Sequence, residues 1–308
     1  MVALAGIRYS LGDAFPLEEI PALTRRPDVL YSLKEKGLVC CSVTTKRPTE
    51  LALKSARETL NVTRISGSDL DAVIYATTSF SDKSFYSERD VAWLMHSLGA
   101  SRAFGTGTFF PGCANAVSAL RVAANLVRAE GMSRILVIIA DKADPSSEEA
   151  RVMWPDISVL SDASVSFVVT DGCVTEFEVM AIRQYSSPAM WDMDYNRNQA
   201  AFFLETAKGA AHAARETLAE LGLVPEECAA LITNNYNRPV MEMIARRCGF
   251  ESDQVYFDNV PRLAHAFAAD TIINLADLIS THGVAGHDPY FLLATGHKNW
   301  GSVVLRGA

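Results

Sequence analysis

The stretch from Phe109 to Ala140, FFPGCANAVSALRVAANLVRAEGMSRILVIIA, reads as a helix followed by a buried strand. Residues 114–130 are rich in Ala, Leu and Val and end at Gly131, which is typical of a helix with a glycine at its C-terminus. The apolar run at 134–140 is short and continuous, as expected of a strand covered on both faces. A helix that leads into such a strand indicates an α/β fold.

The same alternation continues along the rest of the chain. Apolar runs predict strands, and Ala- or Leu-rich segments predict helices. The predicted strands are Leu70–Thr78, Ser164–Thr170, Ala230–Thr233, Gln254–Phe257, Tyr290–Thr295 and Ser302–Arg306. The predicted helices are Ala207–Leu221, Pro239–Cys248 and Ala264–Ile279. A turn signal at Asp171-Gly172 predicts a division into two halves, residues 1–172 and 173–308.

Composition excludes several classes of protein. The 308 residues are 49% hydrophobic and 21% charged, which suits a large globular core. The net charge of −8 and the lack of Lys or Arg runs argue against a nucleic-acid partner. The N-terminal residues lack a signal-peptide pattern, and no apolar run reaches the roughly 18 residues of a membrane span. Six scattered cysteines without a CxxC pair predict no metal site and a reduced, cytoplasmic protein.

Cys113 lies among small residues in PGCANA, between an extended stretch and the predicted helix. The unpaired N–H groups and the dipole at a helix N-terminus favour a thiolate, which is a strong nucleophile toward thioesters. The alternative is a buried structural cysteine, which this segment taken alone favours. Other parts of the chain are therefore needed to decide whether Cys113 is a nucleophile or a structural cysteine.

Segments far from Cys113 resemble a known family. The tail ATGHKNWGSVVLR, residues 294–306, is similar to the glycine-rich turn and last strand of the ketoacyl-ACP synthase III family within the thiolase superfamily. Further blocks of resemblance are Asp69–Ser79 with Ser97-Leu98-Gly99, Arg134–Ala140, and Arg215–Ala219 through Leu231–Asn237. The resemblance implies a five-layer αβαβα thiolase fold of two pseudo-duplicated halves and a homodimer. It also implies acyl transfer from an acyl carrier protein or coenzyme A, with no permanently bound cofactor.

The resemblance assigns roles to four residues. Cys113 corresponds to the nucleophile, and the N–H groups of Cys113 and Gly296 correspond to the oxyanion hole. The alternative for Gly296 is a turn glycine that needs a positive φ. The family's two partner positions, normally His and then Asn, carry Asn234 and His265 here, so the two residue types are exchanged.

This exchange leaves two interpretations open. In the first, His265 is the general base and acid, and Asn234 orients the acceptor or holds a carbonyl. The reaction is then acyl transfer to a small-molecule or carrier acceptor, in secondary metabolism. Members of the family specialised for such transfer use an Asp beside the His, and Asp258 and Asp270 flank His265 without an obvious offset. In the second, the exchange is neutral, and the protein catalyses decarboxylative Claisen condensation.

Two further alternatives concern the protein class and His265 itself. The chain is also compatible with a noncatalytic partner subunit of a ketosynthase-like heterodimer, although such subunits usually lose the nucleophile. His265 is also compatible with a core histidine on an apolar helix.

The donor site differs from the family pattern as well. The family stacks the adenine of coenzyme A between Trp and Arg, whereas the matching stretches here offer Tyr31, Arg151 and Trp154. A carrier-protein phosphopantetheine arm needs no adenine site, so acyl-CoA and acyl-phosphopantetheine both remain candidate donors. A basic surface for an acidic carrier would include Arg25, Arg26, Lys34 and Lys36, or these residues form a solvated face.

Overall fold

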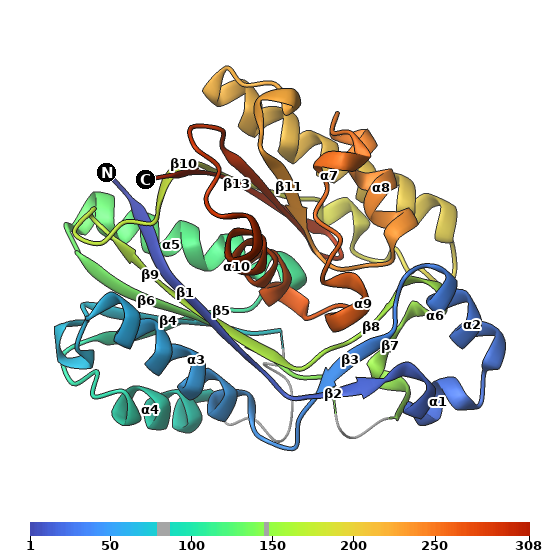
Figure 1. Ribbon diagram of the computed structural model, residues 1–308, viewed down its shortest axis with the longest axis horizontal. Coiled ribbons are helices and arrows are strands. Elements are labelled where there is room, and N and C mark those ends of the chain that lie inside the picture. The colour runs from blue at the N-terminus through green and yellow to red at the C-terminus, as the bar shows by residue number, and fades with distance from the viewer. Residues whose placement is uncertain (79–86, 145–147) are drawn as a thin grey trace.

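A nine-stranded mixed sheet is the frame of the computed structural model, which describes residues 1–78, 87–144 and 148–308. Its strand order is β11-β12-β13-β10-β1-β9-β6-β4-β5 (Figure 1). The bounds of these strands are β1 Ala3–Leu11, β4 Ala72–Ala76, β5 Phe104–Thr108, β6 Arg134–Asp141, β9 Ala163–Thr170, β10 Phe177–Ser186, β11 Ala230–Thr233, β12 Tyr290–Thr295 and β13 Asn299–Gly307. Two small sheets pair β2 (Asp13–Pro16) with β3 (Cys40–Val43) and β7 (Val152–Met153) with β8 (Ser158–Val159).

The two halves of the large sheet repeat one topology. The first half contains, in chain order, β1, β4, β5, β6 and β9. In the sheet they lie as β5-β4-β6-β9-β1, which is the third, second, fourth, fifth and first strand of that half. In the second half, β11-β12-β13-β10 are the second, fourth, fifth and first strands. A parallel bridge between Leu231 and Val255 marks the place of the missing third strand. The halves join where β1 meets β10, through the pairs Ala3–Glu178 and Leu4–Phe177.

The helices form three layers around the two half-sheets. Their bounds are α1 Pro21–Thr24, α2 Pro27–Glu35, α3 Pro48–Thr63, α4 Ser87–Ser97, α5 Asn115–Glu130, α6 Trp154–Ile157, α7 Gln199–Leu221, α8 Arg238–Arg247, α9 Val260–Leu263 and α10 Asp270–His282. Helix α3 covers the outer face of the first half-sheet, and α4 packs beside it; α7 covers the second half-sheet, with α8 beside it. Helices α5 and α10 touch strands of both halves. The result is a five-layer αβαβα arrangement.

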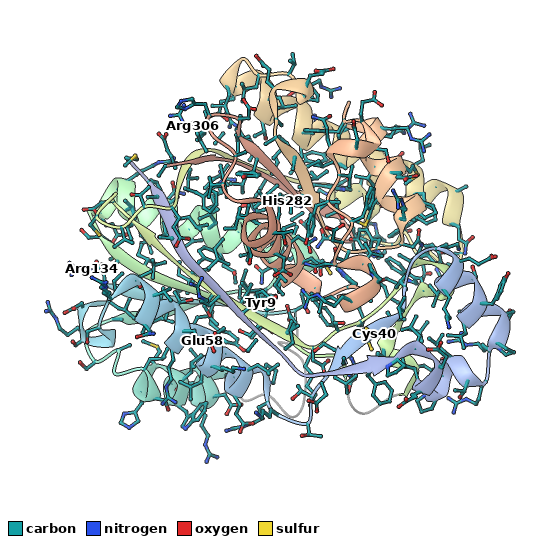
Figure 2. All side chains as sticks on the ribbon, viewed as in Figure 1. Tyr9, Cys40, Glu58, Arg134, His282 and Arg306 are labelled. Carbon is teal, nitrogen blue, oxygen red and sulfur yellow. The ribbon has the colours of Figure 1, made fainter. Side chains whose placement is uncertain are left out.

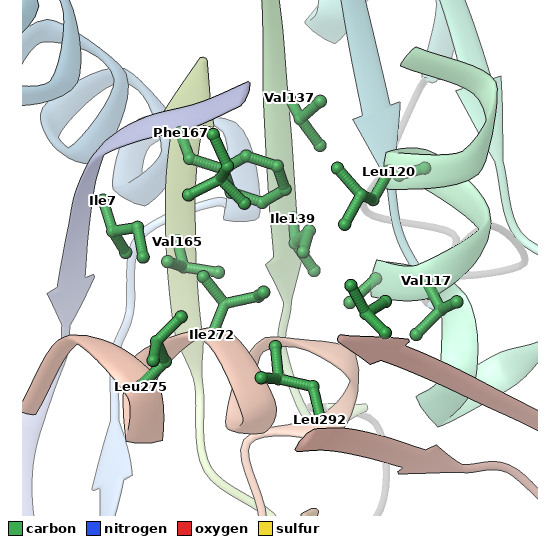
Figure 3. Close-up of a cluster of buried hydrophobic side chains, with 14 of the residues drawn as sticks. Ile7, Val117, Leu120, Val137, Ile139, Val165, Phe167, Ile272, Leu275 and Leu292 are labelled. Atoms are coloured by element: carbon green, nitrogen blue, oxygen red, sulfur yellow. The ribbon is translucent and has the colours of Figure 1, made fainter. Parts of the chain in front are cut away.

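Three apolar clusters correspond to these layers. One fills the space around α5 and α10 between the half-sheets and includes Phe167, Val117 and Ile272 (Figure 3). The others lie between the first half-sheet and α3 with α4, and between the second half-sheet and α7 with α8. Burial of these side chains is the main favourable contribution to folding. The central cluster also fixes α5 and α10, which carry the site described below.

Most of the predicted elements are confirmed, one is wrong, and one begins later than predicted. Helix α5 ends at Gly131, which has a φ of 68°, and β6 and β11 match their predicted runs. The predicted strand Gln254–Phe257 makes only the bridge at Val255. The predicted helix Ala264–Ile279 begins at Asp270, because Ala264 and Phe267 have positive φ values of 47° and 54°.

Three further features can be compared with the sequence: strand β1, the boundary at residue 172, and the length of the apolar helices. Strand β1 was not predicted from the sequence; Gly6 in it has a φ of 69°, and its pairing with β9 shifts register. The predicted boundary between residues 172 and 173 lies in the turn between β9 and β10 and stays a prediction. In the part of the chain that the structure describes, no helix is long and apolar enough to cross a membrane.

Candidate active site

Cys113 lies on a tight turn at the start of a long helix. The short 3₁₀ turn Gly112–Ala114 leads directly into the 16-residue helix α5, and Gly112 has a φ of 57°. Among the described residues, the Cys113 N–H donates to no other group. The predicted place of Cys113, just before a helix N-terminus, is therefore confirmed.

Backbone hydrogen bonds to residues 159 and 161 fix the position of His265, which does not lie in a helix. Its N–H donates to the Val159 carbonyl at 2.9 Å, and its carbonyl accepts from the Ser161 N–H at 2.8 Å. The flanking Ala264 and Phe267 have positive φ values, which cost energy in residues other than glycine. The surrounding structure thus fixes an unusual backbone path, and this path sets the direction of the imidazole ring.

The side chains of Cys113, His265 and Asp270 form a line of contacts. Nε2 of His265 lies 3.2 Å from Sγ of Cys113, and Nδ1 lies 2.5 Å from Oδ2 of Asp270. The His265 and Asp270 side chains are completely buried. Asp270 opens α10, five residues after His265. In a continuous helix that offset would turn the two side chains well apart, so the prediction of a helix concealed the partner.

The surroundings of His265 favour its protonated form. Burial alone lowers the pKa of the imidazole, but the Cys113 sulfur and the Asp270 carboxylate outweigh it and raise the pKa to about 10. An imidazolium that faces a cysteine sulfur is the arrangement found in activated cysteine nucleophiles.

Asn234 connects three backbone segments at the site. Its Oδ1 accepts from the Thr295 N–H at 2.7 Å, and its Nδ2 donates to the carbonyls of Phe267 at 3.1 Å and Cys113 at 3.4 Å. The side chain is completely buried. Asn234 therefore lies against the Cys113 backbone, and its amide contacts protein groups in place of the acceptor or substrate carbonyl predicted from the sequence.

Gly296 packs directly against the turn that carries Cys113. A Cβ atom here would lie 2.3 Å from the Pro111 carbonyl oxygen, so glycine is required by close approach. Its φ is not positive, which corrects the turn-glycine alternative. The Gly296 N–H donates to the Asn299 carbonyl at 2.7 Å. This bond occupies the donor expected for the oxyanion hole and leaves the Cys113 N–H as the available one.

A cavity of about 230 Å³ lies next to Cys113. Its wall is mainly apolar, with side chains from α6, α7 and α8 that include Trp154, Phe202 and Met243. Polar groups on the wall include Tyr236, whose hydroxyl bonds to Thr295 at 2.8 Å and whose ring lies 5.1 Å from that of His265. Tyr236 lies within the TNNYN block but was not predicted as a site residue.

The three predicted donor-binding residues lie in different surroundings. Trp154 lines the cavity and stacks on Tyr195, with ring centroids 4.9 Å apart. The Arg151 guanidinium forms an ion pair with the buried Asp162 and donates to backbone carbonyls. Tyr31 is 65% exposed on α2. The structure brings Trp154 to Cys113 but not Arg151 or Tyr31.

The predicted basic face is partly neutralised. Arg25 and Arg26 both form ion pairs with Glu149, and Lys34 forms one with Glu18. A surface for an acidic carrier would have to compete with these pairs.

The sequence is similar to those of known proteins. Residues 218–307 match the family described as 3-oxoacyl-(acyl-carrier-protein) synthase III C terminal. A beta-ketoacyl-acyl-carrier-protein synthase III of Aquifex aeolicus is 24% identical over 268 residues, covering 84% of each chain. A mycobacterial enzyme of the same name, from Mycobacterium ulcerans, is 20% identical and covers 80% of this chain and 77% of its own.

Solved structures show the same fold. The synthase III of A. aeolicus superposes with a TM-score of 0.80 at 21% identity, over 99% of this chain and all of the other. ChlB3, named as an acyltransferase, superposes with a TM-score of 0.86 at 18% identity, over 99% of this chain and 97% of its own.

Proposed function

Because the chain is a thiolase-fold protein related to ketoacyl-ACP synthase III, we propose that it is an acyltransferase that carries its acyl group on Cys113. One observation supports this above the others: His265 contacts the Cys113 sulfur through Nε2 and the Asp270 carboxylate through Nδ1. A nucleophile, a base and a group that orients the base are the components of covalent acyl transfer.

In the loading step, the Cys113 thiolate attacks the carbonyl carbon of an acyl thioester. The tetrahedral oxyanion accepts a hydrogen bond from the Cys113 N–H. The bond to the donor sulfur then breaks, and the departing thiolate takes the proton from Nε2 of His265. The products are S-acylated Cys113, a free donor thiol and a neutral imidazole.

In the transfer step, His265 acts as the base. The charge on the Cys113 sulfur is the largest contribution that raises the pKa of His265, and acylation removes that charge. The pKa of the imidazole therefore falls in the acyl-enzyme, and Nε2 can accept a proton from an acceptor hydroxyl or amine. The acceptor attacks the acyl carbon, the bond to Cys113 breaks, and the thiolate–imidazolium pair returns.

Decarboxylative condensation is the second candidate, because the relatives in A. aeolicus and M. ulcerans are named as ketoacyl synthases. That reaction needs donors aimed at the carbonyl of a malonyl thioester. Both amide hydrogens of Asn234 point to backbone carbonyls, which supports acyl transfer instead. If a malonyl thioester releases CO₂, and this release depends on Asn234, condensation becomes the favoured reaction.

We further infer that the donor is an acyl thioester of an acyl carrier protein or of coenzyme A. The acceptor we propose is a small molecule or a carrier, in secondary metabolism. The apolar wall beside Cys113 suits a thioester arm. The ion pair of Arg151 with Asp162 argues against its use on an adenine ring and so supports a carrier-borne donor.

We also propose a homodimer that forms through β5. This strand ends the described sheet, and Phe109 and Phe110 beside it are 54% and 71% exposed. A sheet edge with exposed aromatic residues is a surface that a second copy can extend.

Intact-mass spectrometry tests the proposed function. Incubation with acyl-CoA or an acylated carrier should add one acyl mass, and Cys113→Ala should abolish the gain. His265→Ala should slow transfer to an acceptor by about 100-fold. If no donor acylates the protein, the noncatalytic-subunit alternative is supported instead.

A further inference from the structure

A chain of three buried asparagines leads from Asp270 toward the protein surface. Asn235, Asn274 and Asn259 are each at most 2% exposed. The chain ends at Arg262, whose side chain is 44% exposed and which forms an ion pair with Asp277. Tyr9 of β1, labelled in Figure 2, donates its hydroxyl to Asp277 at 2.7 Å.

Each amide in this chain donates to the next one. Arg262 Nη2 donates to Asn259 Oδ1 at 2.8 Å. Asn259 Nδ2 donates to Asn274 Oδ1 at 2.9 Å, and Asn274 Nδ2 donates to Asn235 Oδ1 at 2.8 Å. Asn235 Nδ2 then lies 3.3 Å from Asp270 Oδ1 and also 3.3 Å from Asn274 Oδ1, so Asn235 and Asn274 bond to each other in both directions. We call Asn259, Asn274 and Asn235 the amide chain.

The direction of the amide chain is fixed by chemistry at both ends. Arg262 has no acceptor, so Asn259 must present its oxygen to it, and the Asn259 amide nitrogen then faces the carboxylate of Asp277 at 2.8 Å. At the other end Asp270, as a carboxylate, can only accept. In the middle, the second hydrogen of Asn274 Nδ2 donates to the Thr233 carbonyl at 2.9 Å. The shorter bonds between neighbours in the amide chain therefore all have their donor on the Arg262 side.

Asp270 receives hydrogen bonds from four donors. Its Oδ2 accepts from His265 Nδ1 at 2.5 Å and from the Asn235 N–H at 2.9 Å. Its Oδ1 accepts from the Ala266 N–H at 2.7 Å and from the Asn235 side chain. Asn235 thus supplies two of the four bonds, and any change in its amide reaches the partner of His265 directly.

We propose that Asn235, Asn274 and Asn259 are positioning residues that transmit the charges of Arg262 and Asp277 to the His265–Asp270 pair. Hydrogen bonds in series polarise one another in a medium of low dielectric constant, and here an unbroken series runs from Arg262 to Asp270. The guanidinium at the far end strengthens this polarisation, and Asp277 opposes it by accepting from the same Asn259 amide. The importance of this transmission for catalysis rests on the proposed role of His265 as the base.

The charges of Arg262 and Asp277 predict the direction in which removing each of them shifts the pKa of His265. Removing Arg262 weakens the positive potential at His265, and so raises the pKa of the imidazole. Removing the charge of Asp277 leaves Arg262 without its counter-ion, and so lowers that pKa. The ionisable groups near the two ends of the chain are Cys113, Tyr236, Asp270, Tyr9, Tyr256 and Asp258. All of these remain in the variants, apart from Cys113, which is replaced throughout.

The test is a ¹⁵N NMR titration of the His265 ring in Cys113→Ala protein, with the signal assigned by its loss in His265→Gln. Arg262→Met should raise the measured pKa and Asp277→Asn should lower it, each by about 0.3 unit. In an added Asn274→Leu background both shifts should disappear. Leu275→Ala, a buried change one residue further along α10, should lower the melting temperature without a shift.

Shifts of equal sign, or no shift in either surface variant, would overturn the proposal. Opposite shifts that persist in Asn274→Leu would also overturn it, because the charges would then act through space. If Asn274→Leu does not fold, Asn259→Ala replaces it as the break in the amide chain. The titration requires no acyl transfer, so the amide chain and the proposed function can fail separately.

Discussion

Asp270 holds His265 through Nδ1, which leaves Nε2 directed at the sulfur of Cys113. The carboxylate fixes the tautomer of the neutral imidazole and stabilises the imidazolium. Asn234 acts on the same group of residues from another side, since it bonds the carbonyls of Cys113 and Phe267. These contacts fix the positions of His265 and Cys113 relative to each other.

Replacing Asp270 tests the orienting role directly. Asp270→Asn keeps the size of the side chain but offers His265 an amide, which favours the wrong tautomer. We expect the rate of acyl transfer to fall by about 10³-fold or more while the protein stays folded. Asp258→Asn is the matched control, because that carboxylate is exposed and also close to His265 in sequence. Equal effects of the two changes in single-turnover assays would contradict the assignment.

The pKa of His265 predicts the pH dependence of loading. With a pKa raised to about 10, the imidazole keeps its proton at neutral pH and can supply it to the departing donor thiolate. The loading rate should therefore stay high through neutral pH and decline as the pH rises through about 10. Stopped-flow release of the donor thiol measures this profile. A decline centred near 6.5, the ordinary value for histidine, would show that Asp270 and Cys113 do not hold the proton there.

Among the structural elements, local patterns in the sequence predicted α5, β6 and β11 well, because each has a clear period and a clear end. The segment 264–269 was not predictable in the same way. Its residues, AHAFAA, suit a helix, yet His265 pairs with residues 159–161, which lie far away in sequence. That pairing compensates for the positive φ values of Ala264 and Phe267. The partnership of His265 with Asp270 was hidden for this reason. The sequence did place Cys113 and His265 together, and their side chains are in contact, while their catalytic roles stay a prediction.

The turn between β12 and β13 is a second element on which the site depends. In Gly296→Ala the new methyl group would lie 2.3 Å from the Pro111 carbonyl and push the turn away from Cys113. We expect a loss of about 1–3 kcal/mol in the free energy of unfolding, together with slower loading. Gly286→Ala is the control, because nothing lies within 4 Å of its added Cβ. Unchanged loading in Gly296→Ala, measured by intact mass, would show that this close packing is unnecessary.

At the scale of the whole molecule, the repeated strand order brings the two halves of the site together. The first half contributes Cys113 just before α5, and the second half contributes Asp270 at the start of α10 and His265 five residues before it. Both helices lie in the central layer, between the half-sheets. The site thus forms where the two repeats face each other, which explains why residues 152 positions apart in sequence meet.

The proposed dimer can be tested at the edge of the sheet. Phe110→Asp introduces a charge on the exposed aromatic surface beside β5, which should disfavour association with a second copy. Light scattering coupled to gel filtration should show a dimer for the unchanged protein and a monomer for the variant. Trp191→Asp, at another exposed aromatic residue, should remain a dimer. A monomeric unchanged protein would contradict the proposed assembly.

In the proposed reaction, the Cys113 acyl-enzyme delivers its acyl group to oxygen or nitrogen with His265 as the base. The most direct measurement loads Cys113 with one acyl equivalent, removes the donor, and follows the intact mass after addition of a panel of alcohols and amines or of a malonyl thioester. We expect loss of the acyl mass to a hydroxyl or amine acceptor, dependent on His265 and Asp270, and no CO₂ release with the malonyl thioester. Acyl loss with the malonyl thioester alone, accompanied by CO₂, would contradict the proposed reaction.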